Sequence, residues 1–296
     1  MKILIIGSAG FIGKNLVAFL KNKNHEVFRA DIMMEEQTDY FLLAKENSDF
    51  DKLFLENKFD ICYNCSGAAN VNFSIQNPLL DYELNTYNVY KILDAIRKHN
   101  KGCKFVNLSS AAVYGNPLEM PVSETTEGNP ISPYGFHKLA AENIGFQFAA
   151  LYGIAVINVR IFSVYGPGLT KQIFWDVFLK HQQAGPIKLY GTGEETRDFI
   201  YIDDLCRALE VSAMNTTHSS IINIASGKSI TVKKAVGLLL ENLGNTGVVA
   251  FNNEQRVGDP LYWEADISRF LESGPFEFTK IDEGLQKTAQ WMLTLS

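Results

Sequence analysis

Residues 2–16 read KILIIGSAGFIGKNL, an apolar run followed by three glycines, Gly7, Gly10 and Gly13, and then a helical pattern. Glycine permits a tight turn between a strand and a helix and lets the backbone approach a phosphate group closely. The start of the helix adds N–H donors and the positive end of its dipole. The stretch therefore predicts a strand over 2–7, a helix over 11–22 and a pyrophosphate site between them.

Asp31 ends the next apolar run, HEVFRAD at 25–31. An acid at this distance from a glycine turn is suited to bind the ribose hydroxyls of an adenine dinucleotide. It would repel a 2′-phosphate, so the sequence favours NAD over NADP as the cofactor. Arg29 tempers this preference, although a side chain two positions back on a strand need not reach the ribose.

The first half of the chain alternates short apolar runs with helical patterns. Such an alternation is typical of an α/β fold with a doubly wound parallel sheet of the Rossmann type. We expect a Rossmann domain over 1–165 and a smaller α/β substrate domain mostly within 166–296. The further strands are predicted at 59–67, 103–110, 154–162 and 221–226, the last returning to the main sheet, and the further helices at about 79–99 and 133–152.

The composition excludes several classes of function. Hydrophobic residues make up 46% of the 296 residues, charged residues make up 20%, and the net charge is −6. This balance is ordinary for a globular protein and gives no basic surface for nucleic acid. No apolar run reaches the length of a membrane span. We therefore expect a cytoplasmic protein with neither nucleic-acid nor membrane partners.

Cys62 and Cys65 have the spacing of a metal or redox pair, but no second pair accompanies them. Three positions apart on a predicted strand, the two side chains should point to opposite faces. We expect buried thiols that pack as small hydrophobic groups, and no metal site.

SPYGFHKLAAE at 132–142 places Tyr134 and Lys138 four residues apart, on one face of a predicted helix. An ammonium group beside a phenol should lower the pKa of Tyr134 below its usual value of about 10. Tyr134 would then take a proton from a sugar hydroxyl while hydride leaves for the cofactor. Ser110, at the end of a strand, would hydrogen-bond the same oxygen. His137 points elsewhere on the helix and is expected to be structural.

Further motifs follow in order to about residue 270. They are CSGAANVNFSIQNP (65–78), Asn85, SSAAVYG (109–115), RIFSVYGPG (160–168), GTGEETRDFIYIDD (191–204) and RVGDP (256–260). Together with the glycine turn and the Tyr–Lys pair they are far more specific than any single motif. The sequence resembles the extended short-chain dehydrogenases/reductases, of the NAD-dependent epimerase/dehydratase type that acts on nucleotide sugars.

The resemblance implies a catalytic and cofactor site. Ser110, Tyr134 and Lys138 would form the catalytic triad, and Asn85 would support its architecture. Lys138 would also bridge the hydroxyls of the nicotinamide ribose. The implied cofactor-binding residues are Gly7, Gly10, Phe11, Ile12, Gly13, Asp31, Ser66, Gly67, Tyr134 and Lys138.

The resemblance also implies a substrate site, to which Ser110 belongs. Arg197 and Arg256 match positions that grip the substrate diphosphate, and a guanidinium fork suits that role chemically. The alternatives are an ion pair of Arg197 with Asp198 or Asp204 and a solvated loop charge for Arg256. Relatives commonly have an asparagine that contacts the substrate phosphate where this chain has Ser163, which implies an altered nucleotide pocket.

Ala111 and Ala112 bear on the type of reaction. Family members that eliminate water typically carry an Asp–Glu pair here, and elimination needs both an acid and a base. Methyl groups can serve as neither, so the resemblance implies a 4-epimerase or a 4-ketoreductase of a nucleotide-diphosphate sugar. Asp31 favours the epimerase, because reductases lean toward NADPH. A non-catalytic NAD(H)-binding regulator is a third possibility, and the complete triad argues against it.

The helices at about 79–99 and 133–152 also suggest a homodimer. In the family that the sequence resembles, two such helices per subunit often pack into a four-helix interface. Ala140, Ile144 and Leu151 recur at helical spacing, although the same stripe would also suit a face toward the sheet.

Overall fold

The computed structural model describes residues 1–35, 38–183, 185–216, 218–244, 249–256 and 258–295. Within these residues a seven-stranded sheet has the order β10-β6-β5-β4-β1-β2-β3, and its neighbouring strands are parallel. The predicted Rossmann-type α/β fold is confirmed. The strands are β1 (Lys2–Ile6), β2 (Glu26–Asp31), β3 (Tyr40–Leu42), β4 (Ile61–Asn64), β5 (Lys104–Ser110), β6 (Val156–Ile161) and β10 (Ser220–Ile224).

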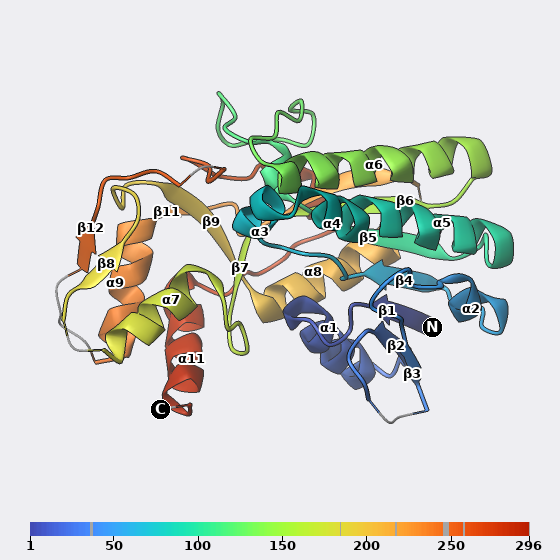
Figure 1. Ribbon diagram of the computed structural model, residues 1–296, viewed down its shortest axis with the longest axis horizontal. Coiled ribbons are helices and arrows are strands. Elements are labelled where there is room, and N and C mark those ends of the chain that lie inside the picture. Colours follow the sequence, from blue (N-terminus) through green and yellow to red (C-terminus); the bar gives the residue numbers. More distant parts are fainter. Residues whose placement is uncertain (36–37, 184, 217, 245–248, 257, 296) are drawn as a thin grey trace.

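Helices cover both faces of this sheet (Figure 1). α5 (Asn88–His99) and α6 (Pro133–Tyr152) lie on one face, and α1 (Phe11–Asn22) and α8 (Ile202–Asn215) lie on the other. Side chains of β1 alternate between the two cores: Leu4 and Ile6 pack on the α5 side, whereas Ile3 and Ile5 pack on the α1 side. Burial on both faces explains why the strands read as continuous apolar runs.

Cys62 and Cys65 take part in the same alternation. Cys62 lies in the core on the α5 side, and Cys65 packs against the core on the α1 side, as predicted. Burial raises the pKa of both thiols, that of Cys65 to about 12. Across the described ranges no cluster of His, Cys, Asp and Glu could hold a metal ion, and no helix could cross a membrane.

The helix expected at about 79–99 is built from three parts. α4 (Pro78–Tyr82) leads into a π-helical turn, η1 (Glu83–Tyr87), and then into α5. Such turns are rare and often occur at functional sites. The smaller helices nearby are α2 (Asp51–Leu55), α3 (Val71–Gln76) and the 3₁₀ turn η2 (Ala111–Val113).

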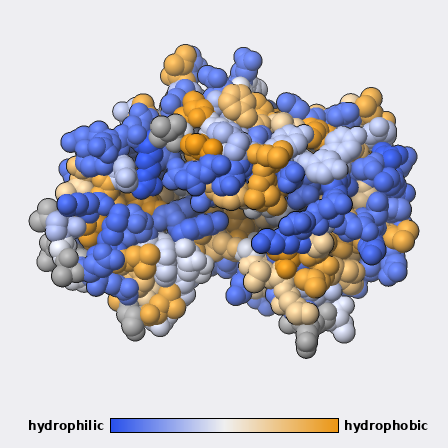
Figure 2. Space-filling model, viewed as in Figure 1, coloured by the Kyte–Doolittle hydropathy of each residue, from blue (hydrophilic) through white to orange (hydrophobic). Residues whose placement is uncertain are grey.

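A second lobe lies at one end of the sheet (Figure 1). Its strands form a three-stranded sheet, β11-β9-β7, and the pair β12-β8. Figure 2 shows the surface notched between this lobe and the end of the molecule that carries α1. The elements are β7 (Ser163–Tyr165), α7 (Gln172–His181), β8 (Ile187–Leu189), β9 (Thr196–Tyr201), β11 (Ser229–Thr231), α9 (Val232–Asn242), β12 (Val249–Phe251), α10 (Ser268–Leu271) and α11 (Ile281–Leu293).

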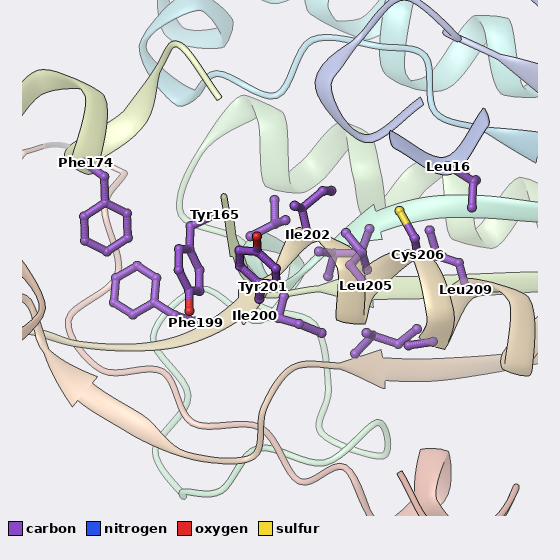
Figure 3. Packing of buried hydrophobic residues seen from close by; sticks show 14 of the residues in the cluster. Leu16, Tyr165, Phe174, Phe199, Ile200, Tyr201, Ile202, Leu205, Cys206 and Leu209 are labelled. Atoms are coloured by element: carbon purple, nitrogen blue, oxygen red, sulfur yellow. The ribbon is translucent and has the colours of Figure 1, made fainter. Parts of the chain in front are cut away.

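One hydrophobic core joins the second lobe to the sheet. Figure 3 shows Tyr165 and Phe199 packed together at one end of this core, with Leu205 and Leu209 of α8 continuing toward Leu16 of α1. The rings of Tyr165 and Phe199 meet edge to face at 5.9 Å. The second lobe and the sheet therefore share one packed core.

Candidate active site

The glycine turn joins β1 to α1. Gly7 has a φ of +81°, and a Cβ on it would lie 2.5 Å from the Ser66 amide nitrogen. A Cβ on Gly13 would lie 2.1 Å from the carbonyl oxygen of Gly7. Both contacts exclude a side chain, so the turn, the helix and the loop after β4 are drawn together. Gly10 is the N-cap of α1 and has no side chain that could satisfy the first N–H groups.

Asp31 ends β2 beside this turn. Its Oδ2 accepts a hydrogen bond from the Ala9 amide at 2.8 Å, and its Oδ1 accepts from the Ile32 amide at 2.7 Å. The turn and the strand end therefore hold the carboxylate in one orientation, with acceptor capacity left for hydroxyl groups.

Arg29 does not offset this negative charge. Its guanidinium donates to Glu35 at 2.5 Å and to Asp39 at 3.0 Å. Two carboxylates thus bind Arg29, the cation that could have weakened the predicted preference for NAD over NADP. The local charge balance disfavours a 2′-phosphate.

Ser66 and Gly67 lie in the loop after β4. The Ser66 hydroxyl donates to Asn64 Oδ1 at 2.6 Å. Gly67 has a φ of +109°, and a Cβ there would lie 2.4 Å from Asn85 Oδ1. Glycine therefore lets Asn85 reach this loop, where its Nδ2 donates to the Ala68 carbonyl at 3.1 Å.

Local sequence fixes the start of α6. The Ser132 hydroxyl accepts from the Gly135 amide at 3.2 Å, and Pro133 occupies the first turn. A Cβ on Gly135 would lie 2.5 Å from the Ala112 carbonyl oxygen, so the helix packs directly on η2. The Tyr134 amide donates to the Ser74 hydroxyl at 3.1 Å, which ties the helix to α3.

The three catalytic candidates meet at the carboxyl end of β5. The Ser110 hydroxyl lies close enough to the Tyr134 phenol to lower its pKa. Lys138 Nζ donates to the Leu108 carbonyl at 2.9 Å and lies 5.8 Å from the centroid of the Tyr134 ring. The structure therefore brings a serine, a phenol and an ammonium together, as the sequence led us to expect.

The pKa of Tyr134 departs from expectation. Burial raises this pKa to about 12, Ser110 acts to lower it, and the Asp81 carboxylate raises it further. Burial lowers the pKa of Lys138 to about 8, while Asp81 and Glu142 raise it. The predicted lowering is wrong for the protein alone, because burial of the phenol is the largest effect on its pKa and Lys138 is not among the groups that shift it.

Ala111 and Ala112 follow Ser110 in η2. Ala111 is fully buried, and the Ala112 amide donates to the Ser110 hydroxyl oxygen at 3.1 Å. The Ser110 proton is thereby left for another acceptor. The two methyl groups provide neither an acid nor a base at this point.

Arg197 lies on β9 and is half-buried. Its Nη1 donates to the carbonyls of Thr196 at 2.8 Å and Leu261 at 3.3 Å. Burial lowers the pKa of Arg197, and the Asp259 carboxylate raises it. A partly desolvated cation that is hydrogen-bonded only to carbonyl groups among the described residues is suited to receive an anion.

The alternative ion pairs of Arg197 are not found in the described part of the chain. Asp198 accepts instead from Ser226 at 2.7 Å, and Asp204 accepts from Arg207 at 2.5 Å. Both acids therefore have other partners, and no carboxylate among the described residues is bonded directly to Arg197.

Arg256 lies in an exposed loop of the same lobe, 4.2 Å from the centroid of the Tyr190 ring. Burial raises the pKa of Asp259, and Arg197 and Arg256 both lower it. The Asp259 carboxylate therefore lies close enough to both guanidinium groups to interact with them electrostatically. Ser163 begins β7 in register with Phe199 of β9, two residues from Arg197.

The loop that carries Arg256 packs against the start of α6. A Cβ on Gly258 would lie 2.7 Å from the Val71 side chain and 3.2 Å from Cβ of Ser132. The Trp263 indole N–H donates to the Gly115 carbonyl at 3.1 Å. These contacts place the two arginines on the side of the molecule where α6 begins.

Three residues of interest were missed in the sequence: Asp81, Tyr190 and Asp259. Asp81 is an acid four positions before Asn85, and that helical spacing was the available signal. Tyr190 directly precedes the GTG motif, and Asp259 lies within RVGDP. Their neighbours come from distant segments, so their environments could not be derived from local pattern.

The fold and this arrangement are those of the extended short-chain dehydrogenases/reductases, enzymes built around a dinucleotide. Residues 3–225 match the model of the NAD dependent epimerase/dehydratase family, and the chain belongs to that family. NAD is therefore its cofactor.

The comparisons extend over the whole chain. Protein CapI of Staphylococcus aureus is 31% identical, over 99% of this chain and 98% of its own length. The structure of MoeE5 in complex with UDP-glucuronic acid and NAD has a TM-score of 0.91, 26% identity and full coverage of both chains. UDP-glucuronic acid 4-epimerase from Bacillus cereus, in complex with UDP-glucuronic acid and NAD, has a TM-score of 0.89 and 26% identity, again over 100% of each chain.

The residues at the glycine turn fit NAD. The Ser8 hydroxyl, inside the turn, is buried without a hydrogen-bond partner among the described residues. Buried polar atoms are normally satisfied, so this hydroxyl and the uncapped start of α1 offer donors to a pyrophosphate. Asp31 would offer an acceptor to the adenosine ribose, as predicted from the sequence.

Proposed function

We propose that the protein is an NAD-dependent nucleotide-sugar 4-epimerase that inverts C4 of a nucleotide-diphosphate hexose through a transient 4-keto sugar. The observation that carries the proposal is the grouping of the half-buried Ser110 with the buried Tyr134 and Lys138, together with Ala111 and Ala112 directly after Ser110. It has the groups for hydride transfer from a carbinol and lacks the acid–base pair of an elimination. The similarity to the Bacillus cereus 4-epimerase supports the same reaction.

Tyr134 is the proposed base. It takes the proton of the 4-hydroxyl as the carbinol is oxidised and gives it back after the keto sugar has turned over. Bound NAD supplies the hydride acceptor and, on return, the hydride. With its pKa at about 12, Tyr134 needs nearby positive charge to act near neutral pH, and Lys138 and the oxidised nicotinamide both favour the phenolate. Ser110 donates to the reacting oxygen.

The second lobe is proposed to hold the nucleotide, in line with the expected substrate domain over 166–296. Arg197 and Arg256 bind the diphosphate, and Ser163 lies near it. The half-exposed Tyr190 ring offers a surface on which a base can stack. We infer a UDP-sugar as substrate, because two similar proteins were solved with UDP-glucuronic acid.

The test is to incubate the protein with a panel of UDP-, dTDP- and GDP-sugars and to identify the products by NMR. A C4 epimer formed without net NADH is the expected result. Stoichiometric consumption of NAD(P)H with a 4-keto sugar would identify a 4-ketoreductase instead. Tight NAD binding without isotope exchange in any sugar would identify a non-catalytic regulator.

We also infer a homodimer formed through α4, α5 and α6. Leu79 on α4 is 71% exposed, and Phe136 and Leu151 on α6 are 57% and 65% exposed, so these helices present large apolar side chains that a partner could cover. Ile144 of the expected stripe packs against the sheet-side core instead. Sedimentation at micromolar concentration tests the inference, and a monomer alone would contradict it.

A further inference from the structure

A buried carboxylate that the proposed reaction does not use lies beside the catalytic helix. Asp81, in α4, is 0% exposed. Its Oδ2 accepts from His137 Nδ1 at 2.6 Å, and its Oδ1 accepts from Asn85 Nδ2 at 3.0 Å. Oδ2 thus binds the residue that directly precedes Lys138, and Oδ1 binds Asn85, the residue expected to support the catalytic triad.

These contacts fix the Asn85 amide. Its Nδ2 donates both to Asp81 and to the Ala68 carbonyl, and neither partner can donate in return. The amide orientation is therefore determined, with Oδ1 toward Gly67. Among the described residues this oxygen is buried and has no hydrogen-bond partner.

The same helices are joined a second time. The Thr86 hydroxyl, next to Asn85, donates to the His137 carbonyl oxygen at 2.8 Å. The His137 ring also meets the Tyr82 ring edge to face at 5.6 Å. Side chains from α4 and η1 therefore hold the turn of α6 that lies between Tyr134 and Lys138.

The charge of Asp81 reaches both catalytic candidates. It raises the pKa of Tyr134 and the pKa of Lys138. A buried carboxylate is costly unless hydrogen bonds hold it, and here an imidazole and an amide do so. The titratable groups around the pair are Tyr82 on α4, the exposed Glu83 and Tyr87 on η1, Tyr134, Lys138 and Glu142 on α6, and Cys65 after β4.

We propose that Asp81 and His137 are a positioning pair of the catalytic site: the carboxylate, held by the imidazole, orients Asn85 and maintains a negative charge beside Tyr134 and Lys138. The pair acts through these three residues. The inference rests on the proposed function, because it gives the pair a part in that reaction. It replaces the structural role expected for His137.

Three variants test the pair. Asp81→Asn removes the charge and gives the site a second donor group. His137→Phe removes the donor to Asp81, whereas His137→Asn keeps an amide N–H near the position of Nδ1. Glu83→Gln is the matched control, because it removes an exposed carboxylate from the adjoining turn.

Asp81→Asn and His137→Phe should lower kcat roughly ten- to a hundredfold, the scale of a small misplacement of reacting groups. The KM for the nucleotide sugar should stay within about threefold of wild type. His137→Asn should restore most of kcat, and Glu83→Gln should equal wild type. Since Asp81 raises the pKa of Tyr134, Asp81→Asn should also move the acidic limb of the pH–kcat profile to lower pH.

Loss of thermal stability in Asp81→Asn and His137→Phe, with kcat and the pH profile unchanged, would overturn the proposal. A wild-type protein that turns over no nucleotide sugar would defeat the proposed function instead. The pair is then decided by NMR of ¹³Cζ-labelled tyrosine in the NAD complex, with Tyr134→Phe to assign the signal. A Tyr134 titration at lower pH in Asp81→Asn supports the charge effect, and an unchanged titration overturns it.

Discussion

The two ends of the proposed site are built differently. Tyr134 and Lys138 lie on a regular helix and are 7% and 5% exposed, whereas Arg256 lies on an exposed loop of the second lobe. A side chain fixed by a packed element keeps its geometry, and a loop tolerates change. The fold of this molecule therefore specifies the proposed reaction more closely than it specifies the substrate.

The ends differ in charge as well. At the catalytic end, Lys138 is a buried cation under the influence of Asp81 and Glu142. At the other end, Arg197 lies near the carboxylates of Asp259 and Glu195, neither of which forms an ion pair with it, and Arg256 lies near Asp259. The first arrangement sets protonation states, and the second has cationic capacity left for an anion.

The largest effect should come from the catalytic end. Tyr134→Phe removes the proposed base but little volume, so kcat should fall roughly two to four decades while NAD binding and folding stay nearly unchanged. Steady-state kinetics and calorimetry measure the two. Tyr114→Phe is the matched control: its buried hydroxyl donates to Asn223 at 2.7 Å, so its loss should affect stability rather than kcat. Near-native turnover of Tyr134→Phe would mean that the base lies elsewhere.

The arginine end should respond in binding rather than in chemistry. Arg197→Ala should raise the KM of the nucleotide sugar roughly ten- to a hundredfold, the scale of lost charge-assisted hydrogen bonds, with kcat little changed. Arg256→Ala should do the same to a smaller extent, because its guanidinium is exposed. Arg97→Ala, which removes a surface partner of Asp94, is the control. Wild-type KM values in both test variants would remove the diphosphate assignment.

Local sequence predicted most of the elements around the seven-stranded sheet, but it did not predict the π-helical turn or the pKa of Tyr134. The helices at 11–22 and 133–152 were found at their expected bounds, because Gly10, Ser132 and Gly153 terminate them by local geometry. The π-helical turn around Asn85 was not foreseen, because it depends on contacts with a loop distant in sequence. The raised pKa of Tyr134 was missed for a similar reason. Desolvation depends on how the whole lobe packs.

The cofactor end offers a smaller effect. Asp31→Ala removes the carboxylate that we expect beside the adenosine ribose. It should narrow the preference for NAD(H) over NADP(H) by roughly tenfold if one close like-charge contact is relieved. Glu35 and Asp39 would still hold Arg29, so the preference should not reverse. Calorimetry with both cofactors measures the change. Tighter NADP(H) than NAD(H) binding by the wild type would contradict the role of Asp31.

The last prediction is that no change occurs at C5 of the sugar, and it tests the type of reaction directly. With its true substrate in deuterated water, the protein should return the hydride to the same sugar, so no NADH should accumulate and no deuterium should enter C5. Proton removal at C5 needs a base there, whereas Tyr134 is assigned to the 4-hydroxyl and Ala111 and Ala112 offer only methyl groups. NMR of the product measures both positions. Deuterium at C5, or loss of water to a 4-keto-6-deoxy sugar, would show that some other pair of groups performs the acid–base work. The residues named at the catalytic end would then not account for the reaction, and the contrast with the adaptable arginine end would no longer hold.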